Sequence, residues 1–254
     1  MFQLGCNYSP ELMELLDRKQ VEIDWIKISD SSRYQSQFRS VNFLKPILFH
    51  ALPPVASETN NEDWNDERIN SVLQECQAPH VAIHLFVRKD DFNKILSREK
   101  LIAKVKELLS IKKSKLTTEV IIENMPLNCM PMEYSYFADP ELITEICEET
   151  RVGLLLDLSH LKISAWYRNQ SEIEYLKQLP LNFVKEIHLN GPRKDGSDYR
   201  DAHLHMRDEN LAFLETALAL TNPRIVTLEY GSEERNCDIE LLNHQINCLR
   251  QILG

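Results

Sequence analysis

The chain has 254 residues, of which 43% are hydrophobic, and its formal net charge is −10. An acidic surface repels phosphate backbones, so non-specific nucleic-acid binding is disfavoured, although a local basic groove is not excluded. No apolar run is long enough for a membrane span, no signal-peptide pattern opens the sequence, and the six cysteines form no CxxC pair, so we expect a reduced, cytoplasmic protein.

Strands and helices are predicted to alternate along the chain. Short apolar or alternating runs predict eight strands, at residues 2–7, 21–29, 46–51, 80–87, 119–124, 152–156, 184–190 and 224–230. Apolar residues at helical spacing predict helices between them, at residues 10–18, 33–43, 67–76, 90–112 (as one helix or two), from 139 onward, 172–178, 208–220 and 237–253. Eight such units can close into a ring, so we expect one α/β domain over residues 1–254, a (β/α)8 TIM barrel.

The first two candidate metal ligands follow the sixth predicted strand. A continuous apolar run at residues 152–156 is typical of a strand buried on both faces. It ends in Asp157, three residues before His160. Zinc, iron and manganese accept carboxylate oxygens and imidazole nitrogens of this kind. The alternative is that Asp157 caps the following turn and His160 is an ordinary loop residue.

Side chains of the same type recur at the other strand ends. In a TIM barrel the carboxyl ends of all strands open into one pocket. Asp201 and His203 lie in the predicted loop after the seventh strand. Nine candidate ligands would then converge: His50, His84, Glu123, Asp157, His160, His188, Asp201, His203 and Glu229.

Each of the nine could be an ordinary hydrogen-bonded or ion-paired residue, but carboxylates gathered in one pocket repel one another unless a cation is present. Nine ligands also exceed the four of a closed structural zinc site, so we expect two or three metal ions.

Three further histidines are not expected to be ligands. His80 begins its strand at the opposite end of the barrel, His205 is predicted to point away from the pocket, and His244 is predicted to be exposed on the last helix. No lysine is evident among the strand ends, where a sugar isomerase would need one, and no strip rich in lysine and arginine accompanies the pocket.

Around these residues the sequence resembles the xylose-isomerase-like TIM barrels. The order of the nine ligands is similar to the trinuclear zinc set of the endonuclease IV family. The surrounding segments, however, are more similar to the DUF692 family, the multinuclear non-haem iron-dependent oxidative enzymes (MNIO). Over residues 122–230 the segments that carry this resemblance are IENMPL, GLLLDLSHLKISA, YLKQLPLNFVKEIHLNG, DAHLHM and VTLEYG.

The chain departs from that family at three places. The glycine-rich opening of many members is replaced by GCNY at residues 5–8. The segment after His50 contains Pro53-Pro54 without the usual extension, and asparagine is common in the family where this chain has His160. These departures indicate a divergent subfamily, whose substrate can differ.

The resemblance implies an enzyme that uses two or three iron ions and dioxygen to modify a peptide oxidatively, typically at cysteine, often with a partner protein that delivers the peptide. The nine residues would be the ligands, and we expect His160, Asp201 and Glu229 to take part in catalysis. Asn124 and Asn190 would hold ligands in place. The side chains expected to line the mouth are Trp166, Tyr167, Arg168, Arg193, Lys194 and Tyr199.

Two other classes of protein stay open at this point. One is a zinc or manganese hydrolase or isomerase that acts on abasic DNA or on a sugar, because such a metal set also suits two-metal phosphoester cleavage. The other is a barrel without chemistry that serves as a binding subunit. The full ligand set argues against the latter, since a decayed site is expected to lose its ligands first.

Overall fold

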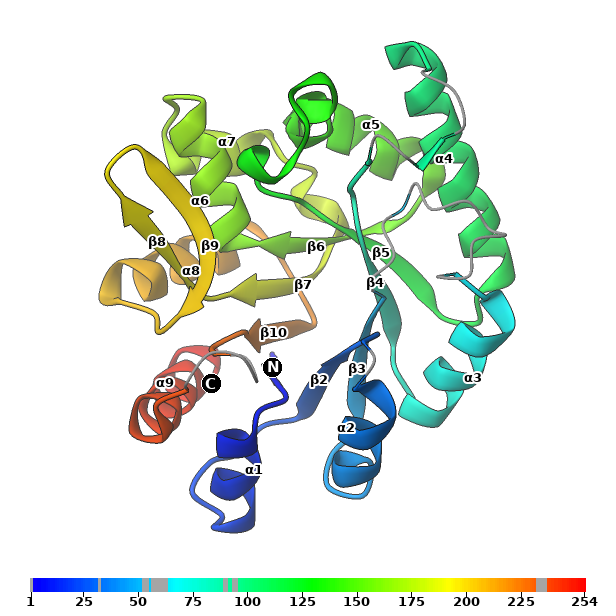
Figure 1. Cartoon of the computed structure of the whole chain (residues 1–254). Helices are drawn as coiled ribbons and strands as arrows, with labels where there is room; N and C mark the ends of the chain where they lie inside the picture. Colours follow the sequence, from blue (N-terminus) through cyan, green and yellow to red (C-terminus); the bar gives the residue numbers. More distant parts are fainter. Residues whose placement is uncertain are drawn as a thin grey trace.

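The predicted TIM barrel is confirmed. The computed structural model describes residues 2–31, 33–51, 55, 64–88, 91–92, 96–231 and 237–254. Eight parallel strands close in the order β1-β10-β7-β6-β5-β4-β3-β2 (Figure 1). They are β1 (Gln3–Asn7), β2 (Trp25–Ser29), β3 (Ile47–Ala51), β4 (His80–His84), β5 (Glu119–Glu123), β6 (Gly153–Asp157), β7 (Val184–Leu189) and β10 (Ile225–Leu228).

Helices surround the barrel (Figure 1). Several begin at a polar side chain that accepts a hydrogen bond from the first helical turn, as Ser9, Asn65, Ser97 and Asp238 do. The helices outside the barrel are α1 (Pro10–Asp17), α2 (Tyr34–Val41), α3 (Asp66–Cys76), α4 (Arg98–Lys115), α5 (Pro140–Thr150), α7 (Glu172–Gln178), α8 (Asp208–Leu220) and α9 (Ile239–Leu253).

Some predicted bounds differ from the observed ones. The strand predicted at residues 21–29 begins at Trp25, and the strand predicted at residues 80–87 ends at His84. The helix predicted at residues 90–112 begins at Arg98 and continues to Lys115. Residues 90 and 93–95 of that prediction lie outside the described residues, as do Pro53, Pro54 and most of the turn-rich segment that contains them.

Two elements at the carboxyl end of the barrel were expected to be turns or loops. A helix, α6 (Leu158–Tyr167), follows β6 without a break. An antiparallel hairpin, β8 (Gly191–Asp195) and β9 (Asp198–Leu204), follows β7. A short 3-10 segment, η2 (Leu127–Cys129), follows β5, and a second, η3 (Met132–Ala138), leads to α5.

Both missed elements lack the usual periodic pattern. Residues 158–165 of α6 are all buried, so the helix has no polar face to mark its period. The hairpin is mostly exposed or half-buried and is rich in charged residues, so its strands show no alternation of apolar and polar residues. Among the described helices, none has the length and apolar character needed to cross a membrane. That residues 1–254 form a single domain stays a prediction.

Candidate metal centre

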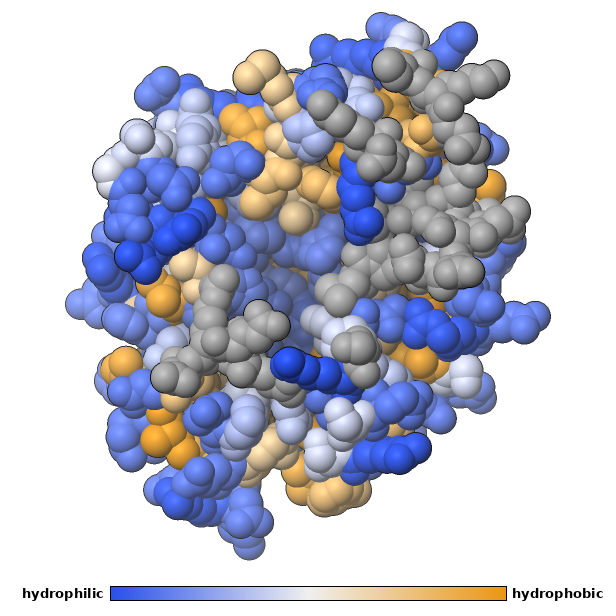
Figure 2. Space-filling view, in the orientation of Figure 1, coloured by the Kyte–Doolittle hydropathy of each residue, from blue (hydrophilic) through white to orange (hydrophobic). Residues whose placement is uncertain are grey.

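The barrel register brings the polar strand ends side by side. His84 on β4 pairs with Glu123 on β5, and Asp157 on β6 pairs with His188 on β7. His50 lies at the corresponding end of β3, opposite Ser29 of β2. This face of the molecule is hollowed near its centre, and hydrophilic residues line the hollow (Figure 2).

Glu123 lies at the centre of the predicted ligands. Its Oε2 atom is 2.8 Å from His50 Nε2 and 3.3 Å from His84 Nε2. Its Oε1 atom is 3.3 Å from His160 Nδ1 and 3.8 Å from His188 Nδ1. The carboxylate is 3% exposed, so four imidazoles converge on one buried group.

Three further candidates gather around His160. Its Nε2 atom is 3.5 Å from Asp201 Oδ2, and that oxygen is 2.7 Å from His203 Nε2. Its Nδ1 atom is 3.9 Å from Asp157 Oδ1. Asp201 and His203 lie on β9, so the hairpin rather than a loop carries them to the centre.

Glu229 completes the set through His188, whose Nδ1 atom is 3.5 Å from Glu229 Oε1. All nine predicted ligands are thus linked in one network. Among the residues that the structure describes, two trios have donor atoms that lie within 4.8 Å of one another: His50 with His84 and Glu123, and Glu123 with Asp157 and His188. Glu123 belongs to both trios, so its two oxygens could bridge two ions.

The tautomer of His160 follows from a backbone contact. Its Nδ1 atom lies 2.9 Å from the carbonyl oxygen of Asn124, and a carbonyl only accepts, so Nδ1 carries the hydrogen. Burial opposes protonation of His160, but the carboxylates of Asp157 and Asp201 raise its pKa. Nε2, which faces Asp201, is therefore the ring nitrogen that would lose its proton to bind a metal. Asn124 also holds Asp157 through its side chain, which accepts from the Asp157 amide at 2.8 Å and donates to the Asp157 carbonyl at 3.1 Å.

Asp157 has one carboxylate oxygen in a helix cap and the other without a partner. Its Oδ1 atom caps α6 by accepting from the His160 amide at 2.7 Å. Its Oδ2 atom is buried without a hydrogen-bond partner, as is Oδ1 of Asp201. Buried acceptors without partners are costly. A cation would satisfy both oxygens, and the mixed set of nitrogen and oxygen donors suits iron, manganese or zinc.

Burial and neighbouring charges shift the pKa values of the histidines in this network. Burial disfavours the charged form of His188, but the Glu229 and Glu186 carboxylates outweigh it and raise its pKa to about 10. Burial likewise opposes protonation of His203, but Asp201 raises its pKa to about 9. Burial lowers the pKa of His50 to about 4. Without metal, part of the imidazole set therefore carries protons at neutral pH.

Comparison with known proteins identifies the family. A family model described as RiPP precursor modification enzyme MbnB/TglH/ChrH matches residues 3–253. The chain belongs to this family. The match covers nearly the whole chain, including all nine linked residues.

Curated relatives of this chain match it over only part of its length. A UPF0276 protein of Psychromonas ingrahamii is 27% identical over 153 residues, which cover 58% of this chain and 54% of that protein. A UPF0276 protein of Bordetella pertussis is 33% identical over 116 residues, which cover 43% of this chain and 40% of that protein. The chain spans about half the length of the curated relatives it matches.

Solved structures share the barrel fold with it. A putative xylose isomerase from Rhodospirillum rubrum superposes with a TM-score of 0.63 at 14% identity, covering 99% of each chain. An AP endonuclease, family 2, from Brucella melitensis superposes with a TM-score of 0.65 at 14% identity, covering 95% of this chain and 97% of the other. At such identities the likeness shows the fold alone.

The side chains predicted for the mouth divide into two groups. Trp166 packs edge-on against Tyr167 and Tyr199, with ring centroids 4.7 and 5.8 Å away, and Lys194 Nζ lies 5.1 Å from the Trp166 ring. The three rings form an aromatic cluster between α6 and the hairpin, and Lys194 lies against it.

The other side chains have different partners. Arg168 donates to Asp139, Arg193 pairs with Asp195 at 2.7 Å, and neither contact involves a candidate ligand. The Asn190 side chain is buried with both polar atoms unpaired, and its backbone carbonyl accepts from Ser159 at 2.8 Å. The predicted roles of Arg168, Arg193 and Asn190 therefore stay predictions.

No lysine was predicted among the strand-end residues, and a buried lysine in the middle of β2 was missed. Lys27 on β2 is 3% exposed, and its Nζ atom contacts Nε2 of His188. Glu186 on β7 also lies inside the barrel, with Oε1 3.0 Å from His188 Nε2. His80 does begin β4, but its Nε2 lies 2.6 Å from Glu186 Oε2. A charged residue inside a strand buried on both faces was the signal that could have revealed Lys27.

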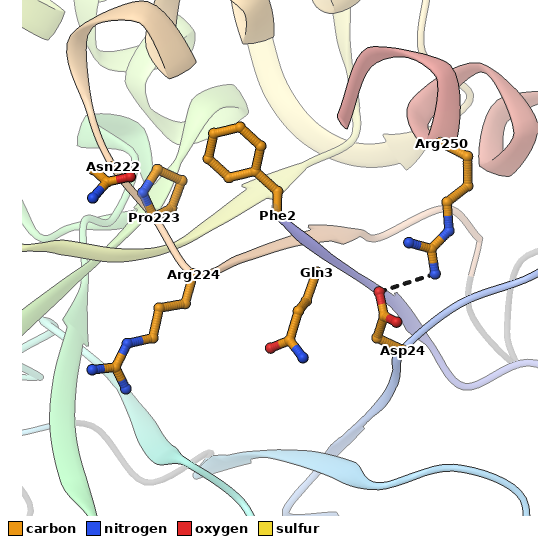
Figure 3. A pocket seen from close by; sticks show the side chains of 7 residues that line it. All are labelled: Phe2, Gln3, Asp24, Asn222, Pro223, Arg224 and Arg250. Carbon is orange, nitrogen blue, oxygen red and sulfur yellow. Dashed lines mark ion pairs between the residues drawn. The ribbon is translucent and has the colours of Figure 1, made fainter. Parts of the chain in front are cut away.

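The other histidines lie outside the centre. His205 is exposed beside Tyr230, and His244 is exposed on α9. A cavity of about 490 Å³ lies at the amino ends of β1, β2 and β10, the end of the barrel opposite to the candidate centre (Figure 3). There Arg250 pairs with Asp24 at 2.9 Å, and no candidate ligand lines the cavity.

Proposed function

We propose that this protein is a multinuclear, iron-dependent enzyme that uses dioxygen to modify a peptide oxidatively at cysteine. The observation that carries the proposal is the buried network of nine nitrogen and oxygen donors centred on Glu123. Membership of the MbnB/TglH/ChrH family supports a peptide as the substrate.

The residues of the chain would hold the metal through complementary roles. Glu123 Oε2 lies beside His50 and His84, and its Oε1 lies beside His188, so the carboxylate would bridge two ions. Asp157 would bind through Oδ2 while its Oδ1 fixes the start of α6. His160 would bind through Nε2, because Asn124 holds its other ring nitrogen in the protonated form. Such outer contacts orient ligands and tune the metal they bind.

Iron is proposed because oxidation by dioxygen needs a metal that changes valence. Zinc has no accessible redox step and acts only as a Lewis acid. Thiolates are also good ligands for iron, which suits a cysteine-containing peptide.

The surface around the centre suits an extended peptide more than a nucleic acid. Hydrophobic residues form part of the rim of the hollow, over the segment between β5 and α5 (Figure 2). Met132 in that segment is 89% exposed. The aromatic cluster of Trp166, Tyr167 and Tyr199 lies beside α6 and the hairpin. With a net charge of −10, the molecule repels a phosphate backbone. A partner protein could deliver the peptide.

The test compares two metal-loaded forms of the protein. Metal-free protein is loaded anaerobically with iron or with zinc, and each form is offered a thiol-containing peptide encoded beside its gene and, separately, a duplex with an abasic site. We expect the iron form alone to consume oxygen and change the mass of the peptide. We expect neither form to cleave the duplex.

A matched variant makes the comparison decisive. Asp201→Asn removes one donor oxygen beside His160 and His203, so it should reduce oxygen consumption by the iron form at least tenfold. Efficient duplex cleavage by the zinc form, lost in Asp201→Asn, would contradict the proposal and indicate a hydrolase.

A further inference from the structure

The cavity at the amino ends of β1, β2 and β10 has no role in the proposed function. Its volume of about 490 Å³ lies within the range of small-molecule pockets, about 300–1,000 Å³. Its wall brings both ends of the chain together, with Phe2 and Gln3 from the start and Arg250 from α9 (Figure 3). The side chains of this wall combine hydrogen-bond donors with an apolar surface.

The charged side chains of the wall leave one positive charge unbalanced. Arg224 and Arg250 are accompanied by a single carboxylate, that of Asp24, although the whole molecule carries a net charge of −10. Asp24 pairs with Arg250, and within the described part of the chain no side chain pairs with the Arg224 guanidinium. The excess charge therefore lies on Arg224, which is exposed at the edge of the cavity.

Arg250 is only partly satisfied by its neighbours. Its Nε atom donates to the Glu22 carbonyl at 2.8 Å, and its Nη2 atom lies 2.9 Å from Asp24 Oδ2. That oxygen also accepts from the Leu4 amide at 2.7 Å. Among the described residues the buried Nη2 atom has no aligned hydrogen-bond acceptor. Because a buried donor without a partner is costly, this nitrogen favours a further acceptor in the cavity.

The carboxamide of Gln3 adds a donor of fixed orientation. Trp25 Nε1 lies 3.1 Å from Gln3 Oε1, and an indole nitrogen only donates, so the oxygen of the carboxamide is turned toward Trp25. Its nitrogen, with two N–H groups, is left for the cavity. Phe2 and Pro223 supply the apolar part of the wall (Figure 3).

We infer that this cavity binds a small organic carboxylate. A guanidinium group binds a carboxylate through two parallel hydrogen bonds, and the apolar part of the ligand would pack against Phe2 and Pro223. The one unbalanced positive charge matches the single charge of a carboxylate, whereas a phosphate group carries more than one negative charge at neutral pH. The inference goes beyond the proposed function and does not depend on the metal centre.

The experiment uses Trp25 as a reporter. The chain has three tryptophans, whose indole N–H groups give separate NMR signals, and that of Trp25 contacts Gln3 in the cavity wall. Metal-free protein is titrated at constant ionic strength with benzoate, with benzyl alcohol, which has the same ring without the charge, and with inorganic phosphate. We expect benzoate to shift the Trp25 signal to saturation, and the other two compounds to leave it nearly unchanged.

Substitutions assign the binding to this cavity. Arg224→Gln should weaken benzoate binding about tenfold or more, because charge-assisted hydrogen bonds are lost. Arg224→Lys keeps the charge without the planar fork, so its affinity should lie between the two. Arg39→Gln is the matched control, because Arg39 is an exposed arginine on α2 that does not line the cavity. It should bind benzoate as wild-type protein does, and the other two indole signals show that each variant is folded.

Four results would overturn the inference. The first is the absence of a saturable shift of the Trp25 signal with benzoate. The second is equal binding of benzyl alcohol, which would indicate an apolar hollow that does not recognise charge. The third is tighter binding of phosphate, which would indicate a site for inorganic anions. The fourth is an unchanged affinity for benzoate in Arg224→Gln. None of these results bears on the proposed function, which is tested with metal-loaded protein.

Discussion

At the scale of single residues, Glu123 organises the centre. Its position at the end of β5 lets both oxygens face the barrel axis, where imidazoles from β3, β4, β7 and α6 meet them. Four imidazoles around one carboxylate are a poor arrangement for hydrogen bonding alone, because a carboxylate binds protonated rings and neighbouring imidazolium ions repel one another. With bound cations, the rings can be neutral and the carboxylate can bridge.

The pKa shifts predict that metal uptake displaces protons. His203 has a pKa raised to about 9 in the metal-free protein, so its ring is protonated at pH 7. A metal ion binds only neutral imidazole. The apparent affinity for metal should therefore rise as pH increases from about 7 to about 9, and binding at pH 7 should release protons. Calorimetry in two buffers of different ionisation enthalpy measures the number released.

Single substitutions show which rings supply those protons. His203→Ala should release about one proton fewer than wild-type protein at pH 7. His50→Ala is the control, because burial lowers the pKa of His50 to about 4 and the ring is already neutral. The number of protons released should be unchanged in that variant. Equal loss in both variants would contradict this account of the site.

At the scale of elements, α6 and the hairpin of β8 and β9 complete the centre. Asp157 ends β6 and caps α6, so one residue both supplies a donor and turns the chain toward His160. The hairpin then brings Asp201 and His203 over the barrel. His203 adopts a positive φ of 47°, which is uncommon outside glycine and marks a local constraint at the site.

The hairpin depends on the glycine at its base. A Cβ atom at Gly191 would lie 2.3 Å from the backbone oxygen of His205, so Gly191→Ala must displace β8 from β9. We expect a loss of stability of about 1–3 kcal/mol, as for other overpacked sites, and at least tenfold weaker metal binding, because Asp201 and His203 move with β9. Thermal unfolding and metal titration measure the two effects.

The matched change lies in the same hairpin. Gly196 is in its turn at φ +59°, and among the described residues none except its own chain neighbours approaches within 4 Å of the position that a Cβ atom would take there. Asparagine tolerates this backbone conformation. Gly196→Asn should therefore bind metal as wild-type protein does. Weaker binding in Gly196→Asn than in Gly191→Ala would show that the hairpin does not position the ligands as described.

At the scale of the whole molecule, the sequence predicts the barrel and the grouping of nine polar side chains at the carboxyl ends of its strands, for physical reasons. Apolar runs and helical spacing locate eight strands, and parallel closure then forces their polar ends together. Lys27 was missed because the alternation of Trp25 to Ser29 does not say which face of the strand points into the barrel, although a charge inside a strand buried on both faces was a signal. Glu186 had a readable signal, since it lies two residues before His188 and so shares its face of β7.

The most direct test of the metal centre is to locate the metal by anomalous diffraction. Crystals of iron-loaded protein are measured on both sides of the iron absorption edge. We predict iron peaks about 2 Å from the Glu123 oxygens, as expected for a metal–carboxylate bond. The peaks should be lost or much weaker in Glu123→Gln and retained in Glu119→Gln, at the other end of β5, where Glu119 pairs with Lys185. Iron-loaded crystals without a peak among the nine residues, or with an unchanged peak in Glu123→Gln, would contradict the account.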